Sequence, residues 1–271
     1  MSGLAAPPPP APFEPGRFAS TVSYYVANRP RYPQALLELV LKHTGMCAGA
    51  SVLDLGCGPG FLANGFAQLG LTAVGLDPNP GMLDAARQEA TRLGCTVDYR
   101  LGSSYDLDAL PVRFDLAVMG RSFHWTDRPR TLQSLERLVS ANGAVVLFYD
   151  SHMRCAENDF EGVLNRMRER YSRDAIRLKL KKSHAVKPDE SVFLDSTFSC
   201  MIRIGQLERR ALTADTIVGR AFSLSATSPE KLGDRLPAFE SELRARLAEL
   251  SPNGEFTELV EFTALICRRA Q

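Results

Sequence analysis

The feature that most constrains the fold of this chain is the segment Ser51–Gly60, where a short apolar run changes abruptly into alternating glycines. Its sequence is SVLDLGCGPG, and the apolar part is typical of a buried strand. Gly56, Gly58 and Gly60 allow the chain to turn sharply and leave bare backbone that a ligand can approach. A helical pattern follows over residues 61–69, and the free N–H groups at its start favour an anionic ligand group. The segment predicts a strand, a loop and a helix that cradle a ligand.

The glycine spacing distinguishes this loop from the dinucleotide-binding loop. That loop carries G-x-G-x-x-G, whereas Phe61 stands here at the position of the last glycine. We therefore do not expect an NAD-dependent oxidoreductase. A second apolar run ends at Asp77, about 20 residues after the first glycine, where a carboxylate can accept hydrogen bonds from ribose hydroxyls. We expect a ligand that contains ribose.

These two segments resemble motifs of the class I S-adenosylmethionine-dependent methyltransferases, and more narrowly of the small-molecule group called type 11. Residues 54–60, DLGCGPG, resemble the first motif of that family, and residues 75–83, GLDPNPGML, resemble the second. The resemblance implies a Rossmann-like, doubly wound sheet of seven mostly parallel strands with a helical insertion or lid. It also implies S-adenosylmethionine as the methyl donor, with in-line displacement at the sulfonium methyl and no metal.

The resemblance assigns a set of residues to the methyl donor. Asp77 would bind the ribose, and residues 102–104 would meet the adenine, next to Tyr105, which stands where many relatives have an acidic residue. Arg29, in the segment 24–33, would bind the donor carboxylate through two hydrogen bonds, or the segment would only dock the first helix. The residues expected at the donor are Tyr24, Arg29, Gly56, Gly58, Gly60, Asp77, Pro78, Met82, Ser103, Ser104 and Gly120.

The predicted strand over residues 114–119 leads to His124 and Trp125, a pair that type 11 relatives commonly carry. His124 is the candidate general base, because an ordinary imidazole has a pKa of about 6.5 and accepts a proton near neutrality. Lining of the pocket is the other role open to it. Tyr25, Arg121 and Trp125 are the residues expected to contact the acceptor, with solvent contact as the alternative for Arg121.

Composition limits the remaining possibilities. Lys plus Arg total 32 and Asp plus Glu total 31, so the net charge of +1 gives no general attraction to nucleic acid or an anionic membrane. An RNA or protein methyltransferase and a non-catalytic nucleoside-binding module are the alternatives to a small-molecule methyltransferase. The six cysteines include no C-x-x-C pair, and we expect reduced thiols in a cytoplasmic protein with neither a metal site nor a membrane span.

Strand and helix signals alternate over residues 51–149, as expected for a parallel sheet covered by helices on both faces. Residues 1–15, which include four consecutive prolines, are expected to be a disordered leader, and residues 16–271 to form one methyltransferase domain. Residues 150–195 are expected to form a lid or substrate-binding insertion. Its basic part, residues 177–187, would attract an acceptor that bears a carboxylate, or would be a solvated loop. The sequence leaves the acceptor atom and the oligomeric state open.

Overall fold

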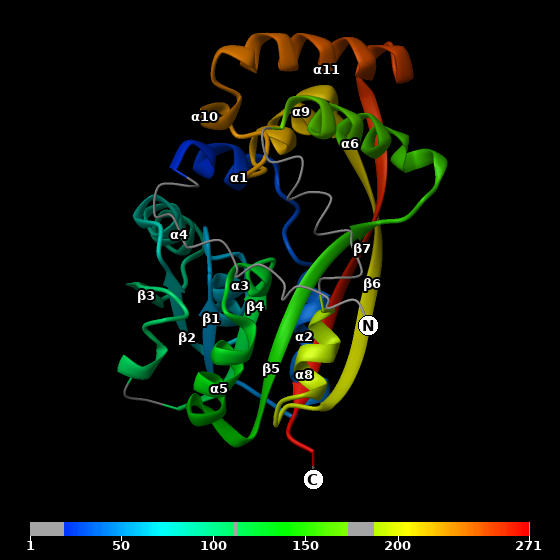
Figure 1. Cartoon of the computed structure of the whole chain (residues 1–271). Helices are drawn as coiled ribbons and strands as arrows, with labels where there is room; N and C mark the ends of the chain where they lie inside the picture. The colour runs from blue at the N-terminus through cyan, green and yellow to red at the C-terminus, as the bar shows by residue number, and fades with distance from the viewer. Residues whose placement is uncertain (1–18, 111–112, 173–186, 271) are drawn as a thin grey trace, which may run out of the picture.

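A seven-stranded sheet forms the centre of the computed structural model, which describes residues 19–110, 113–172 and 187–270 (Figure 1). Within these residues the strand order is β3-β2-β1-β4-β5-β7-β6. β1 to β5 run parallel, and β7 is antiparallel to both of its neighbours. The predicted Rossmann-like, mostly parallel sheet is confirmed. The predicted leader at residues 1–15 and nearly all of the basic segment 177–187 lie outside the described residues.

The elements alternate along the chain in the first half and become longer in the second. The strands are β1 (Ser51–Leu55), β2 (Thr72–Asp77), β3 (Val97–Leu101), β4 (Phe114–Gly120), β5 (Val139–His152), β6 (Cys200–Thr213) and β7 (Glu255–Arg268). The described α-helices are α1 (Val22–Asn28), α2 (Gln34–Thr44), α3 (Phe61–Gln68), α4 (Pro80–Leu93), α5 (Arg128–Leu138), α6 (Asp159–Tyr171), α8 (Asp189–Leu194), α9 (Ala214–Phe222), α10 (Pro229–Leu232) and α11 (Leu236–Leu250). Short 3-10 turns are η1 (Ala19–Thr21), η2 (Leu107–Ala109), η3 (Phe123–Trp125), η4 (Ala156–Asn158) and η5 (Gly233–Arg235).

Local sequence signals account for the ends of the helices. Before α4, the Asn79 side-chain oxygen accepts a hydrogen bond from the backbone nitrogen of Met82 at 3.2 Å. The helix ends at Gly94, which has a φ of +66°. Asp127 caps α5 with its side chain, which accepts a hydrogen bond from the backbone nitrogen of Arg130. Such caps satisfy backbone groups that a helix end leaves without partners.

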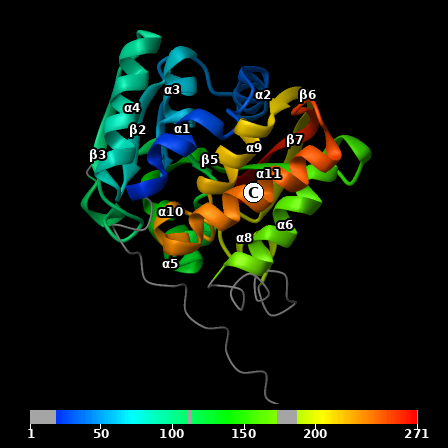
Figure 2. The same cartoon turned by 90° about the horizontal axis from the view of Figure 1, so that it is seen from above.

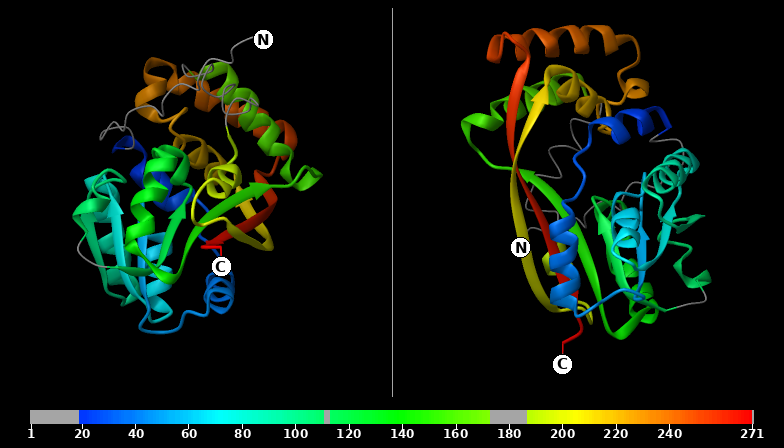
Figure 3. Two further views of the ribbon diagram at one scale, coloured as in Figure 1. Left: turned by 60° about the horizontal axis from the view of Figure 1, so that its bottom comes forward. Right: turned by 180° about the vertical axis from the view of Figure 1, so that it is seen from behind.

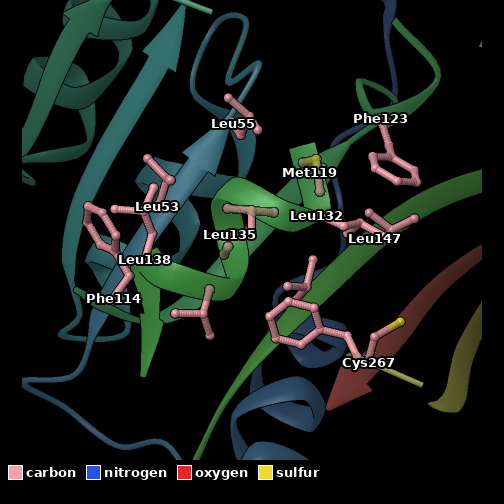
Figure 4. Close-up of a cluster of buried hydrophobic side chains, with 14 of the residues drawn as sticks. Leu53, Leu55, Phe114, Met119, Phe123, Leu132, Leu135, Leu138, Leu147 and Cys267 are labelled. Atoms are coloured by element: carbon pink, nitrogen blue, oxygen red, sulfur yellow. The ribbon is translucent and has the colours of Figure 1, made fainter. Parts of the chain in front are cut away.

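Helices cover both faces of the sheet. α2, α3 and α4 lie on one face, and α5 and α8 lie on the other (Figure 1). Figure 4 shows the cluster beneath α5, where Leu132 and Leu135 pack against Leu53 of β1 and Leu147 of β5. On the opposite face, Phe66 of α3 is fully buried against the sheet. Burial of apolar side chains on both faces explains why the central strands read as nearly continuous apolar runs.

Five helices form a further layer above the carboxyl ends of the strands, which we call the roof: α1, α6, α9, α10 and α11 (Figures 1, 2 and 3). The roof has its own apolar core, which includes Phe160 of α6, Phe222 of α9 and Phe239 of α11. Residues 150–195 were expected to form a lid or substrate-binding insertion, and that role stays a prediction. From this range the roof contains α6, together with α1 and helices within residues 214–250, while α8 packs beside α5.

A buried ion pair joins the roof to the sheet. Arg220 of α9 donates two hydrogen bonds to the carboxylate of Glu258 on β7, at 2.6 and 3.1 Å. The two side chains are 5% and 0% exposed. His152 of β5 contacts the same carboxylate at 2.8 Å. Burial alone would raise the pKa of Glu258, but the hydrogen bonds with His152 and Arg220 lower it to about 2.

We expect Glu258→Ala to lower the free energy of unfolding by about 3–5 kcal/mol, because Arg220 then keeps a buried charge without its partner. Urea denaturation at pH 7 measures the change. Glu157→Ala is the matched control, since Glu157 forms an exposed ion pair with Arg209 at 3.4 Å, and it should leave the unfolding midpoint nearly unchanged. Equal midpoints for the two variants would contradict the importance of the buried pair.

Candidate functional site

The loop from Gly56 to Gly60, which we call the glycine loop, joins β1 to α3 at the carboxyl edge of the sheet. Gly56, Gly58 and Gly60 have φ values of +70°, +53° and +78°, a region that other residues rarely adopt. A Cβ atom at Gly56 would lie 2.6 Å from the Cβ of Ser122, and one at Gly60 would clash with the Tyr99 hydroxyl. At Gly58 a Cβ would meet no described atom within 4 Å. Of these three positions, only Gly58 borders open space.

Asp77 ends β2 and fastens the glycine loop. Its Oδ2 accepts a hydrogen bond from the backbone nitrogen of Gly58 at 2.8 Å, and its Oδ1 accepts one from that of Asn79 at 2.9 Å. Burial raises the pKa of Asp77, and these two backbone hydrogen bonds oppose the increase. A carboxylate offers about four acceptor positions, so Asp77 keeps capacity for ligand hydroxyls beside Gly58.

Asp54 is a second carboxylate at this edge, and the sequence reasoning missed it. Its Oδ2 accepts a hydrogen bond from the backbone nitrogen of Ala63 at 3.0 Å. Its Oδ1 is buried and has no hydrogen-bond partner among the described residues. Burial raises the pKa of Asp54 to about 7. A charged residue inside the apolar strand Val52–Leu55 is the sequence signal that could have identified it, since a buried carboxylate needs a partner.

The segment 24–33 was expected to cover the donor, and its residues separate in the structure. The Tyr25 ring lies 6.0 Å from the ring of Phe61, the residue that follows the glycine loop. Arg29 lies over the Tyr25 ring, with 5.3 Å between its Cζ and the ring centroid. Tyr24 packs instead on Phe222 in the roof core, with ring centroids 5.2 Å apart. The structure therefore brings Tyr25, but not Tyr24, next to the start of α3.

Arg121 follows β4 and holds the N-terminal segment against β5. Its guanidinium forms a partly buried ion pair with Asp150 and donates a hydrogen bond to the carbonyl oxygen of Pro30 at 3.0 Å. It also lies 4.6 Å from the centroid of the Tyr32 ring. Arg121 has a φ of +58°, which is uncommon for a residue other than glycine and typical of functional sites. We expected this side chain at the acceptor, and in the structure it contacts two segments of the protein, residues 30–32 and β5. Contact with the acceptor stays a prediction.

His124 and Trp125 lie in η3, directly after β4. Phe123 anchors this turn, because it is buried and its ring lies 5.4 Å from the ring of Phe193. His124 is exposed, Trp125 is half-buried, and their ring centroids are 5.0 Å apart. Both residues are therefore at the carboxyl edge that carries the glycine loop. General-base action by His124 stays a prediction.

The other residues expected at the donor also lie at the carboxyl ends of strands. They are Pro78 and Met82 after β2, Ser103 and Ser104 after β3, and Gly120 at the end of β4. Ser103 donates hydrogen bonds to Asp106 Oδ2 from its backbone nitrogen at 2.7 Å and from its hydroxyl at 2.8 Å. Asp106, one residue after the exposed Tyr105, therefore supplies the carboxylate of this loop.

The described residues contain neither a cluster of metal ligands nor a membrane-spanning helix. Among them, no three His, Cys, Asp or Glu side chains are grouped so that they could hold a metal ion. None of the helices in the described part of the chain has both the length and the apolar character needed to cross a bilayer. All six cysteines are free.

Residues 52–143 match the family model of a methyltransferase domain. The chain is 34% identical over 118 residues to a ubiquinone biosynthesis O-methyltransferase of Azorhizobium caulinodans, a match that covers 41% of this chain and 47% of the relative. The chain spans about half the length of the curated relatives it matches. The matched region contains the glycine loop and Asp77.

Two solved structures are similar over nearly the whole chain. An S-adenosylmethionine-dependent methyltransferase from Thiobacillus denitrificans, in complex with S-adenosylhomocysteine, has a TM-score of 0.51 and 16% identity, covering 93% of this chain and 98% of its own. Another from Geobacter sulfurreducens, with the same compound, has a TM-score of 0.51 and 17% identity, covering 94% of this chain and 99% of its own. At such identities the likeness shows a shared fold.

We expect Asp54→Asn to remove one pH dependence of stability. The pKa of Asp54 is about 7 in the folded protein and ordinarily 3.8, so the folded state holds more protons between these values. The contribution of Asp54 to the free energy of unfolding is complete below pH 3.8 and is lost as the pH rises through 7. The free energy of unfolding falls over this range by at most about 1.4 kcal/mol per pH unit. Urea denaturation from pH 4 to pH 9 should show a steeper decline for the wild type than for Asp54→Asn.

The exposed Asp98 provides the control for this measurement. Asp98→Asn should follow the wild-type pH course, since it removes a solvent-exposed carboxylate whose ion-pair partner, Arg100, is also exposed. Parallel courses for the wild type and Asp54→Asn would show that Asp54 does not take up a proton near neutrality.

Proposed function

We propose that this chain transfers a methyl group from S-adenosylmethionine to a small molecule. The premise is that residues 52–143 match a methyltransferase domain and that the chain has the fold of class I methyltransferases. The observation that carries the proposal is the open space at Gly58, bordered by Asp77 at the end of β2. The unpartnered oxygen of Asp54 lies at the end of β1, the strand that enters the same loop.

The residues present fit the parts of this donor. The carboxylate of Asp77 would accept hydrogen bonds from the ribose hydroxyls, and the bare backbone at Gly58 would let the ligand approach closely. The buried Oδ1 of Asp54 would pair with the ammonium of the amino-acid end, which would complete its missing interaction. When bound, the donor would supply a methyl group on a positively charged sulfonium, which leaves as a neutral thioether once the methyl group is transferred.

The chain's own contribution to this reaction is chiefly positioning. Alignment of an acceptor atom with the methyl carbon and sulfur can contribute about 7–11 kcal/mol. β1, β2 and β4 are adjacent parallel strands, so their carboxyl ends hold the glycine loop, Asp77 and η3 on one rigid edge. The roof lies above this edge and would exclude water from the reacting groups (Figure 1).

A small-molecule acceptor is supported by the Azorhizobium caulinodans relative, which is named for ubiquinone biosynthesis. An acceptor with a carboxylate is the form that we favour, because Arg29 lies at the interface of roof and sheet with no carboxylate partner among the described residues. The balanced net charge of +1 favours a metabolite over nucleic acid. The free thiols are consistent with a cytoplasmic location.

We expect Gly58→Ala to weaken donor binding while the protein still folds. Isothermal calorimetry with S-adenosylmethionine and S-adenosylhomocysteine should show at least a tenfold loss of affinity, because the new methyl group would occupy the open space. Gly94→Ala is the matched control, with a φ of +66° and no described atom within 4 Å of its Cβ position. Both variants should lose about 1 kcal/mol of stability, and only Gly58→Ala should lose affinity.

Absence of binding by the wild-type protein at millimolar S-adenosylmethionine would reject the proposed function. Binding without formation of S-adenosylhomocysteine from a pool of metabolites would indicate a nucleoside-binding module instead. Transfer of a labelled methyl group to a component of that pool would identify the acceptor.

With the acceptor from that screen, we expect His124→Gln to lower kcat about 100-fold or more if the acceptor is a hydroxyl, because a positioned base is lost. The pH dependence of kcat should change with it, while donor affinity stays near the wild-type value. His43→Gln, an exposed histidine at the end of α2, is the control. An effect confined to the KM of the acceptor would assign His124 to the pocket wall.

A further inference from the structure

A group of charged side chains lies where the roof meets the sheet, which we call the charged layer. Two members directly follow α1 and β4, and the others belong to β5, α9 and β7: Arg29, Arg121, Asp150, His152, Arg220 and Glu258. Two of its three arginines have carboxylate partners. Arg121 pairs with Asp150, and Arg220 pairs with Glu258.

Arg29 is the exception within the charged layer. It forms no ion pair with any described residue, and its Nε donates a hydrogen bond to the Ser223 hydroxyl at 2.8 Å. Its two terminal nitrogens have no hydrogen-bond partner among the described residues. Burial lowers the pKa of Arg29, with Arg121 adding to the effect and Tyr25 and Asp150 opposing it, yet a guanidinium keeps its charge in proteins.

Ser223 fixes the orientation of this guanidinium. It follows α9 and is 1% exposed. Its hydroxyl donates to the backbone oxygen of Arg220 at 2.6 Å and accepts from Arg29 Nε. Because the hydroxyl has a single proton, its donation to Arg220 leaves its lone pairs directed at Arg29. Ser223 and Arg29 are 194 positions apart in the sequence, so this contact depends on the roof.

We propose that Ser223 is a positioning residue, which orients Arg29 so that the two terminal nitrogens of the arginine bind a ligand carboxylate. This proposal rests on the proposed methyl transfer. Arginine offers two parallel donors that match the two oxygens of a carboxylate. Arg29 is partly buried, so its guanidinium loses hydration without gaining an anionic partner among the described residues, and a ligand carboxylate would provide that partner. The carboxylate belongs either to the amino-acid end of the donor or to the acceptor, and both sources require the same fork.

Calorimetry with two nucleosides tests whether the carboxylate bound by Arg29 belongs to the methyl donor. S-adenosylhomocysteine carries the amino-acid carboxylate, whereas 5′-methylthioadenosine retains the adenosine and sulfur without it. We expect the affinity for S-adenosylhomocysteine to fall about 10- to 100-fold in Arg29→Gln and about fivefold in Ser223→Ala. The affinity for 5′-methylthioadenosine should be unchanged in both variants. The double variant should be no weaker than Arg29→Gln alone, because Ser223 acts through Arg29.

Titration of carboxylate probes into the protein saturated with S-adenosylhomocysteine tests whether the carboxylate bound by Arg29 belongs to the acceptor. The probes are succinate and benzoate. If the carboxylate belongs to the acceptor, these probes should bind the wild type and lose affinity in Arg29→Gln and Ser223→Ala, while S-adenosylhomocysteine binds all three proteins equally. Either selective loss supports the proposal.

Two further variants separate positioning from general damage. Ser223→Thr keeps the hydroxyl and should restore affinity to within about twofold of the wild type. Arg92→Gln, which removes an exposed arginine paired with Glu89, should leave both nucleosides unaffected. Equal losses for S-adenosylhomocysteine and 5′-methylthioadenosine would assign Ser223 a merely structural role, and no loss for any probe would overturn the proposal. Failure of the wild type to bind either nucleoside would reject the proposed function instead.

Discussion

The hydrogen bond from the backbone nitrogen of Gly58 to Asp77 connects the two strand ends on which the site depends. β1 and β2 are parallel neighbours, with Leu55 opposite Leu76, so their carboxyl ends lie side by side. A loop with three positive φ values can leave β1 only where glycines stand, and the Asp77 carboxylate holds it in place. The open space at Gly58 is a consequence of this arrangement.

The roof adds an electrostatic constraint to this edge. Charges between the roof and the sheet are mostly paired, as in the pair of Arg220 with Glu258, because an unpaired buried charge is costly. At the carboxyl edge of the sheet, Asp54 has an oxygen without a partner, and Arg29 has no anionic partner among the described residues. A ligand with both an ammonium and a carboxylate, such as an amino-acid moiety, would complete both groups.

Much of the fold could be predicted because its signals are local. The glycine loop, the helix from Pro80 to Leu93 and the Asp127 cap follow from apolar periodicity and turn chemistry over short stretches. In contrast, the apolar stretches of the sequence near residues 198–204 and 259–267 coincide with only parts of β6 and β7. The remainder of β6 includes polar, exposed residues such as Arg209, because an edge strand has a neighbouring strand on one side only. The length of β6 is set by its pairing with β7.

By itself, the sequence determined the parallel sheet, the glycine loop at its carboxyl edge and the acidic residue after β2, since each depends on residues close together in the chain. Tertiary structure alone decided that Arg121 joins Asp150, that Asp54 keeps an oxygen without a partner, and that Ser223 meets Arg29. These contacts join segments far apart in sequence, and the packing of the roof on the sheet determines which polar groups come within hydrogen-bonding distance. No periodic pattern or local spacing specifies such a contact.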